Sequence, residues 1–400
     1  MKLLKALPAA SLVALVAIAP AGAEQKPAID RSKNVEFVEN FAYDGGSELS
    51  AHGRYVYSGE ANAKGGEGRG TAPKEGGLHI FDIERMEEVA FLHCPGTDND
   101  VEFVRPGLVA MSFSQNQCAP TTGGGLMLID VSNAAKPRII SSVTSGDNHT
   151  MKPMPGGRYI YMNGGNIAGT AARGGVIIDT KNPEKPKVAT TTTDVMDCHD
   201  VSFKVVEEDR QYGYCAGAVG TGEVQIWDIS DPLKPTVISR IVNPAIQYSH
   251  YAIANQDGTL LAIDDEAFAA HDCNTGVSPT GRVWIYDISN PLVPRPVSSF
   301  APPGGRGGDP MFANIGNYAG WVDSWCMSHG LDWHPKKNAV AVTWFTAGIS
   351  VIDLTDPLQP TEAAYFDSDD SASYSALWHG EYLFSNDHMR GVDVLQIKGY

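Results

Sequence analysis

The stretch GEVQIWDISDPLKP, residues 222–235, decides the fold because variants of it recur along the whole chain. Each copy consists of a glycine, an apolar run, usually an aspartate, and often a proline-bounded turn. The aspartates of six copies are 48, 49, 49, 59 and 66 residues apart. Self-similarity at this period predicts an array of repeated blades. The other copies are GGLHIFDI (76–83), GGLMLIDVSNAAKP (124–137), GGVIIDTKNPEKP (174–186), GRVWIYDISNPLVP (281–294), AGISVIDLTDPLQP (347–360) and a degenerate GVDVLQI (391–397).

Two further strands are expected upstream of each copy, such as RYIYMNG (158–164) and TLLAIDD (259–265). The nearly continuous apolar runs are typical of strands covered on both faces by neighbouring sheets. Four strands in each of seven repeats predict an all-β, seven-bladed β-propeller. The recurring aspartate is expected to accept backbone N–H bonds in the turn and is not interpreted as catalytic.

The chain ends soon after the last repeat, so blade 7 lacks an outer strand of its own. NVEFVENFAYD (34–44) resembles PRIISSVTSGD (137–147), an outer strand of another blade, in pattern. We therefore expect the N-terminal strand to complete the last blade and close the ring, which removes two open sheet edges.

The Gly-apolar-Asp-x-Ser-Asp-Pro-x-x-Pro repeat resembles the LVIVD-repeat family of exported bacterial β-propellers, over roughly residues 34–400. The resemblance implies the fold and the blade boundaries. It implies little about chemistry.

The first 23 residues have the pattern of a secretory signal peptide: a basic start, an apolar core and a small-residue ending at Ala23. Residues 24–400 are expected to form one propeller domain in the periplasm or outside the cell. The net charge is −17, or −19 without Lys2 and Lys5, which argues against nucleic acid as a partner. No other stretch is long and apolar enough to embed the chain in a membrane.

Aligned repeats place a histidine at one shared position in four consecutive blades, near the start of the innermost strand. Inner strands of a propeller line its central channel, so these imidazoles are predicted to meet near one mouth. The four are His149, His199, His250 and His329, and Asn99 takes the position in blade 2.

The loop between the second and third strands of each blade opens on the same face. Its candidates for the mouth are Glu60, Asp265, Glu266, His271, Asp387 and His388. The segment 302–325 carries Phe312, Tyr318, Trp321 and Trp325 and is interpreted as an aromatic lid or wall.

Six cysteines in an exported chain favour three disulfides. Repeat positions place the two thiols of each pair at one end of adjacent strands or blades. The expected pairs are Cys94–Cys118, Cys198–Cys215 and Cys273–Cys326, although the sequence alone permits fifteen connectivities.

Neutral imidazoles in a ring suit a divalent transition metal such as Zn, Cu, Fe or Ni, with Glu266 or Asp200 orienting a histidine or acting as general base. Two other interpretations remain open. One is metal-free acid–base chemistry by His250 with Tyr251 or Tyr248, and the other is an inherited histidine with a structural role. The catalytic candidates are His149, His199, His250, His329, His388, Glu266 and Tyr251, and the metal ligands are the four aligned histidines.

Two classes of function follow from these features. The first is an exported enzyme that performs metal-assisted hydrolysis, lyase chemistry or oxidation on a small molecule at the channel mouth. The second is a non-catalytic propeller that binds an envelope protein partner. The fold itself does not decide between them.

Overall fold

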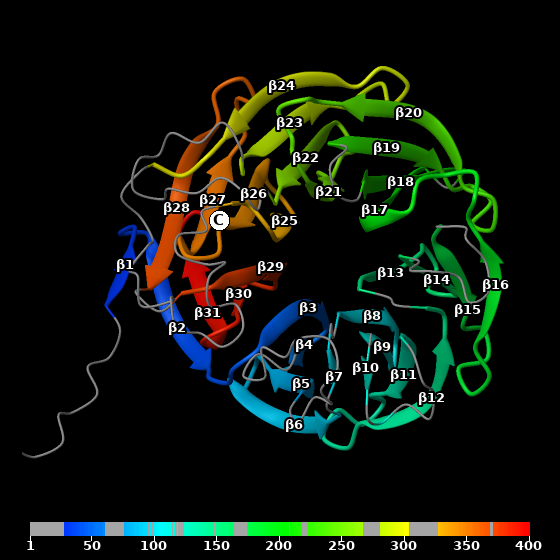
Figure 1. Cartoon of the computed structure of the whole chain (residues 1–400). Helices are drawn as coiled ribbons and strands as arrows, with labels where there is room; N and C mark the ends of the chain where they lie inside the picture. The colour runs from blue at the N-terminus through cyan, green and yellow to red at the C-terminus, as the bar shows by residue number, and fades with distance from the viewer. Residues whose placement is uncertain are drawn as a thin grey trace, which may run out of the picture.

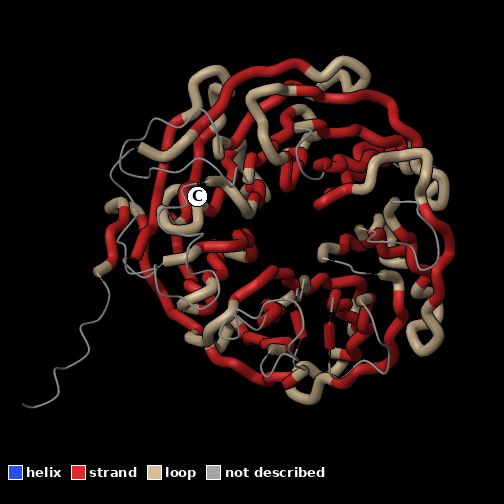
Figure 2. Tube along the Cα trace, viewed as in Figure 1, coloured by secondary structure: helices blue, strands red, loops and turns tan. Residues whose placement is uncertain are grey.

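Seven antiparallel sheets stand around a central axis in the computed structural model of this chain (Figure 1). The structure describes residues 28–60, 76–94, 96–97, 100–113, 115–116, 118, 124–146, 149–163, 174–207, 209–217, 222–266, 281–303, 327–368 and 371–400. Figure 2 shows that these residues form strands joined by loops and turns. The prediction of an all-β, seven-bladed propeller is confirmed. The described residues include no helix with the length and apolar character needed to cross a membrane.

Each blade runs from an innermost strand beside the channel to an outermost strand at the rim, and its strands are named in that order. Blade 1 is β3 (Gly46–His52), β4 (Tyr55–Glu60), β5 (Gly77–Asp82) and β6 (Glu87–His93), and blade 2 is β8 (Val101–Arg105), β9 (Leu108–Phe113), β11 (Gly125–Asp130) and β12 (Arg138–Thr144). Blade 3 is β13 (Met151–Pro153), β14 (Tyr159–Met162), β15 (Val176–Asp179) and β16 (Lys187–Thr191), and blade 4 is β17 (Cys198–Glu207), β18 (Arg210–Gly217), β19 (Glu223–Asp228) and β20 (Thr236–Val242). Blade 5 is β21 (Ser249–Ala254), β22 (Leu260–Asp265), β23 (Val283–Asp287) and β24 (Arg295–Phe300), and blade 6 is β25 (Leu331–Trp333), β26 (Ala339–Thr343), β27 (Ile349–Asp353) and β28 (Thr361–Ser368). Blade 7 is β29 (Ser373–His379), β30 (Tyr382–Asp387), β31 (Gly391–Ile397) and β2 (Val35–Phe41).

The hydrophobic core lies between the blades. All six residues of β5 are buried, whereas the outer strand β6 alternates between exposed and half-buried positions. One cluster joins Tyr214 and Ile226 of blade 4 to Ile263 of blade 5. Because both faces of each middle strand pack on a neighbour, the apolar runs of the sequence are continuous.

The recurring aspartate stabilises the turn that follows each third strand. Asp228 Oδ1 accepts the backbone N–H of Ser230 at 2.8 Å, and Asp231 Oδ1 accepts that of Leu233 at 3.1 Å. The same bond recurs in five other blades, at Asp82, Asp130, Asp179, Asp287 and Asp353. These carboxylates are structural, as predicted.

The ring closes through strands from the two ends of the chain. β2 pairs antiparallel with β31, from Val35 opposite Ile397 to Phe41 opposite Val392. Asn40 Nδ2 donates to Asp393 Oδ1 at 2.8 Å across this pair. The predicted closing strand is therefore confirmed.

Three short strands were not predicted. β1 (Ile29–Arg31) adds a fifth strand to blade 6 by pairing with β28, and β7 (Gly96–Thr97) forms a two-residue ribbon with β10 (Gln115–Asn116). All three residues of β1 are exposed, so no apolar pattern marks the strand in the sequence.

Disulfides join Cys94 to Cys118 and Cys198 to Cys215, with Cα atoms 5.6 and 5.2 Å apart. Both pairings were predicted. The proposed Cys273–Cys326 pair lies outside the described residues. Two disulfides fit an oxidising compartment.

Candidate metal centre

The innermost strands carry the four aligned histidines to one end of the channel. His199 lies in β17 and His250 in β21, while His149 and His329 lie two residues before β13 and β25. Strands β17 and β21 each contain a register shift, between Cys198 and Asp200 in β17 and between Ser249 and Ala252 in β21. Each shift brings two consecutive side chains to the channel side. A regular strand would turn successive side chains to opposite faces, and such a bulge re-aims one of them.

The imidazoles form an arc that continues into blade 7. Adjacent rings contact one another from His149 to His388, with Tyr374 of β29 between His329 and His388. The centroid distances along the arc are 5.0 Å for His149–His199, 4.3 Å for His199–His250, 4.1 Å for His250–His329, 3.9 Å for His329–Tyr374 and 4.3 Å for Tyr374–His388.

Three buried groups at the centre of this arc have the arrangement of metal ligands. Glu266 Oε2 lies 3.8 Å from His250 Nε2, and Glu266 Oε1 lies 3.8 Å from His329 Nε2. One ligand atom from each of the three residues lies within 4.8 Å of the other two. Each carboxylate oxygen thus faces one imidazole at a distance too long for a hydrogen bond.

The opposite nitrogen of each ring faces an oxygen atom. His329 Nδ1 donates to the carbonyl oxygen of Tyr374 at 2.8 Å, and His250 Nδ1 lies 3.3 Å from Asp264 Oδ2. Because a carbonyl can only accept, neutral His329 carries its proton on Nδ1 and its lone pair on Nε2. This is how a second residue orients a metal-binding imidazole.

Burial keeps these histidines neutral. It lowers the pKa of His250 and of His329 well below the usual value, and neighbouring histidines lower both further. Burial also raises the pKa of Glu266 to about 8. Neutral imidazole is the form that binds metal.

A second possible ligand group shares His250. His199 Nδ1 lies 3.4 Å from Asp200 Oδ2, which lies 3.8 Å from His250 Nε2. Ligand atoms of these three residues likewise lie within 4.8 Å of one another. The candidate centre therefore comprises His199, Asp200, His250, Glu266 and His329.

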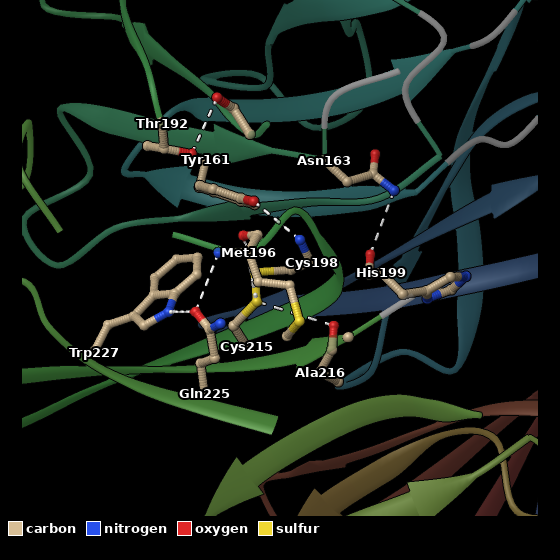
Figure 3. Close-up of a disulfide and its surroundings, with 12 residues drawn as sticks. Tyr161, Asn163, Thr192, Met196, Cys198, His199, Cys215, Ala216, Gln225 and Trp227 are labelled. Atoms are coloured by element: carbon tan, nitrogen blue, oxygen red, sulfur yellow. Dashed lines mark hydrogen bonds between the residues drawn. A yellow bond between two sulfur atoms is a disulfide. The ribbon is translucent and has the colours of Figure 1, made fainter. Parts of the chain in front are cut away.

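Residue His199 is anchored by blade 3 and by the disulfide beneath it (Figure 3). Asn163 Nδ2 donates to the His199 carbonyl at 3.4 Å, and Tyr161 Oη accepts the backbone N–H of Cys198 at 3.2 Å. The Cys198–Cys215 bond ties the start of β17 to β18.

The remaining candidates fall outside the ligand groups. His149 and His388 stand at the two ends of the arc, and burial lowers the pKa of His388 to about 4. The Tyr251 ring faces Lys152, whose Nζ lies 5.5 Å from its centroid. Tyr248 packs edge-on against His199 at 5.3 Å.

Other predicted mouth residues have structural partners. Asp265 accepts the N–H groups of Gln247, Tyr248 and Gly281, and Asp387 accepts that of Ala372. Glu60 binds His79 within blade 1. His271 and the aromatic segment containing Phe312, Tyr318, Trp321 and Trp325 lie outside the described residues.

Comparisons with known proteins agree with this architecture. The family model of the LVIVD repeat matches residues 121–145. The chain is a seven-bladed β-propeller that carries a match to the LVIVD repeat. A search of curated proteins gave no match.

Two solved structures resemble this propeller in fold. The β-propeller domain of Cps50 (Swd1) from Myceliophteria thermophila has 10% identity and a TM-score of 0.57, covering 91% of this chain and 100% of that chain. Hydrazine synthase of Kuenenia stuttgartiensis has 11% identity and a TM-score of 0.60, covering 90% and 97%. At these identities the likeness shows the fold alone.

The channel also contains a group of charged residues, of which the sequence-based prediction named only Asp200. A cavity of about 290 Å³ continues from His250 and His329 along the channel. Its charged lining residues are Glu48, Asp100, Glu102, Lys152, Asp200 and Asp332.

The aligned repeats contained a pattern that marks these charged residues. Asp100 and Asp200 directly follow the shared histidine position in blades 2 and 4. Glu102, Lys152 and Asp332 lie three residues after it in blades 2, 3 and 6. Burial, helped by Glu102, raises the pKa of Asp100 to about 8, and burial raises that of Asp332 to about 7.

Proposed function

We propose that this protein is an exported enzyme that performs metal-assisted chemistry on a small molecule at the histidine-lined channel mouth. The observation that carries the proposal is the orientation of His250 and His329, whose Nδ1 atoms face oxygen atoms of Asp264 and Tyr374 while their Nε2 atoms face Glu266. The reaction class is hydrolysis, lyase chemistry or oxidation, and the metal is Zn, Cu, Fe or Ni.

The ligand spacing supports such an ion. Two ligands roughly 2.0–2.1 Å from a tetrahedral ion lie roughly 3.3 Å apart. The 3.8 Å separations of Glu266 from each Nε2 atom need only a small side-chain movement to reach that value. Three protein ligands leave a position for substrate or water, which is the pattern of catalytic sites.

The neighbouring residues supply the remaining functions. A bound metal would polarise a substrate oxygen or lower the pKa of a bound water. Asp200 Oδ2, 3.8 Å from His250 Nε2, is placed to hold or accept a proton beside the ligands. Asp264 and the Tyr374 carbonyl orient the imidazoles, and the aromatic arc restricts access of bulk water.

Elemental analysis of untagged protein produced by export tests this proposal. We expect near-stoichiometric transition metal in the wild type, and its loss from the folded variants Glu266→Gln and His329→Gln. His52→Gln is the matched control because His52 is exposed at the far end of an inner strand. If the wild type is metal-free after export, the metal centre is wrong, and metal-free acid–base chemistry or a protein partner becomes the better hypothesis.

A further inference from the structure

The cavity below the histidines is lined by more acidic than basic side chains. Among the described residues that line it are five carboxylates and one ammonium, that of Lys152. Lys152 Nζ forms an ion pair with Glu102 Oε1. The other four carboxylates, Glu48, Asp100, Asp200 and Asp332, have no cationic counterpart among the described lining residues.

One of these carboxylates is incompletely bonded. Asp100 is 4% exposed, and its Oδ2 accepts the backbone N–H of Met151 at 2.7 Å. Its Oδ1 is buried and has no hydrogen-bond partner among the described residues. A buried acceptor without a donor is costly, because desolvation is not offset. Asp100 lines the cavity, so a donor bound there would satisfy Oδ1.

The geometry favours an organic cation over a second metal ion. Among the described residues, only two groups bring three ligand atoms within 4.8 Å of one another, and both groups contain His250. The carboxylates of Glu48, Asp100 and Glu102 are therefore too widely spaced for one small ion. The volume of about 290 Å³ equals that of roughly ten liquid waters, which is enough for a short amine.

We propose that the channel cavity binds the ammonium group of a small organic amine through Asp100 and Glu48. Each N–H of an alkylammonium can donate to one of the separated carboxylates, and the ion pair would favour their ionised forms. His250 and His329 line the same cavity, so the other end of the amine would face the ligand group. That last step rests on the proposed metal centre, whereas binding of the ammonium does not.

Isothermal titration calorimetry with putrescine tests the site in the full mature protein. Butanediol of the same chain length is the uncharged probe. We expect putrescine to bind and butanediol not to bind. Asp100→Asn and Glu48→Gln should each weaken putrescine binding about tenfold, because each removes one charge-assisted hydrogen bond.

The control variant is Glu36→Gln, which removes a carboxylate from the outer strand β2. It should bind putrescine as the wild type does. Each variant is also checked by thermal unfolding, and two cavity variants are used so that a folding failure of one leaves the other informative.

Three results would overturn the inference. They are equal binding of butanediol, unchanged putrescine binding in both cavity variants, and displacement of putrescine by stoichiometric Ca²⁺, which would indicate an ion site. Repeating the titration on chelator-treated protein separates the two proposals. Putrescine binding that survives chelation supports the amine site whatever the metal content proves to be.

Discussion

Two buried clusters of histidine and acidic residues in this protein have similar composition but differ in how their imidazole nitrogens are bonded. In blade 1, His79 has both ring nitrogens bonded to carboxylates, with Nδ1 2.8 Å from Glu88 Oε1 and Nε2 3.3 Å from Glu60 Oε2. In blades 5 and 6, only the Nδ1 atoms of His250 and His329 have close acceptors.

The difference shows in the pKa of each ring. Burial alone would lower the pKa of His79, but the bonds to Glu60 and Glu88 outweigh it and raise that pKa. Burial lowers the pKa of both His250 and His329 well below the usual value. The carboxylate partners therefore favour the protonated form of His79, while burial favours the neutral forms of His250 and His329. The number of histidines and glutamates does not distinguish the two clusters, whereas the distances from their ring nitrogens to the neighbouring oxygen atoms do.

The largest expected effect is the loss of stability on removing His79. His79→Gln leaves buried Glu60 facing a neutral amide, and breaking a buried pair costs about 3–5 kcal/mol. We expect about 2–3 kcal/mol, because the Glu88 side chain is 41% exposed and can be solvated. Chemical denaturation of metal-free protein measures it. His250→Gln should cost less in the same assay, about 1 kcal/mol, because a neutral ring loses one hydrogen bond. Equal losses would remove the distinction between the clusters.

A smaller effect is expected from the residue that orients His250. Asp264→Asn weakens the acceptor at Nδ1, so metal affinity should fall about 10- to 100-fold, as for other residues behind a ligand. Competition with a chromophoric chelator measures the affinity. Asp257→Asn, in an exposed turn of the same blade, is the control. An unchanged affinity in Asp264→Asn would show that Asp264 does not orient the ligand.

The two clusters should also differ in the sign of their pH dependence. The folded-state pKa of His79 is raised, so its stabilisation is fully present below the unfolded pKa of about 6.5 and is lost as pH rises through the folded pKa. The stability difference between wild type and His79→Gln should therefore shrink from pH 6 to pH 9.

The channel histidines should behave in the opposite way in metal-free protein. Their folded pKa is lowered, so stability falls as pH drops below about 6.5, by up to about 1.4 kcal/mol per pH unit for each ring. A His250→Gln/His329→Gln double variant should lose this acid slope. Denaturation at pH 5, 6 and 7 checks it, and an identical slope in wild type and variant would contradict it.

Much of this arrangement could be predicted because the chain repeats itself. The period gave the blades, the turn aspartates and the closing strand, and the histidine register identified His250, His329 and, through the adjoining loop, Glu266. Tertiary geometry decided the rest. Asp200 and Tyr251 were named from the sequence, but the register shifts beside them have no sequence pattern, and β1 is too short and polar to show periodicity.

Ring closure through β2 also has a consequence for the order of folding. Asn40 and its partner Asp393 are 353 residues apart in the chain, so β2 must remain without its partner until nearly all of the protein has been made. Contacts this distant in sequence are slow to form, and unpaired strand edges invite aggregation meanwhile. Tyr374 and His388, the last rings of the channel arc, belong to the blade that β2 completes. Chains that stop before blade 7 therefore lack the end of the arc, and the blade that carries it reaches its full four strands only when β2 pairs with β31.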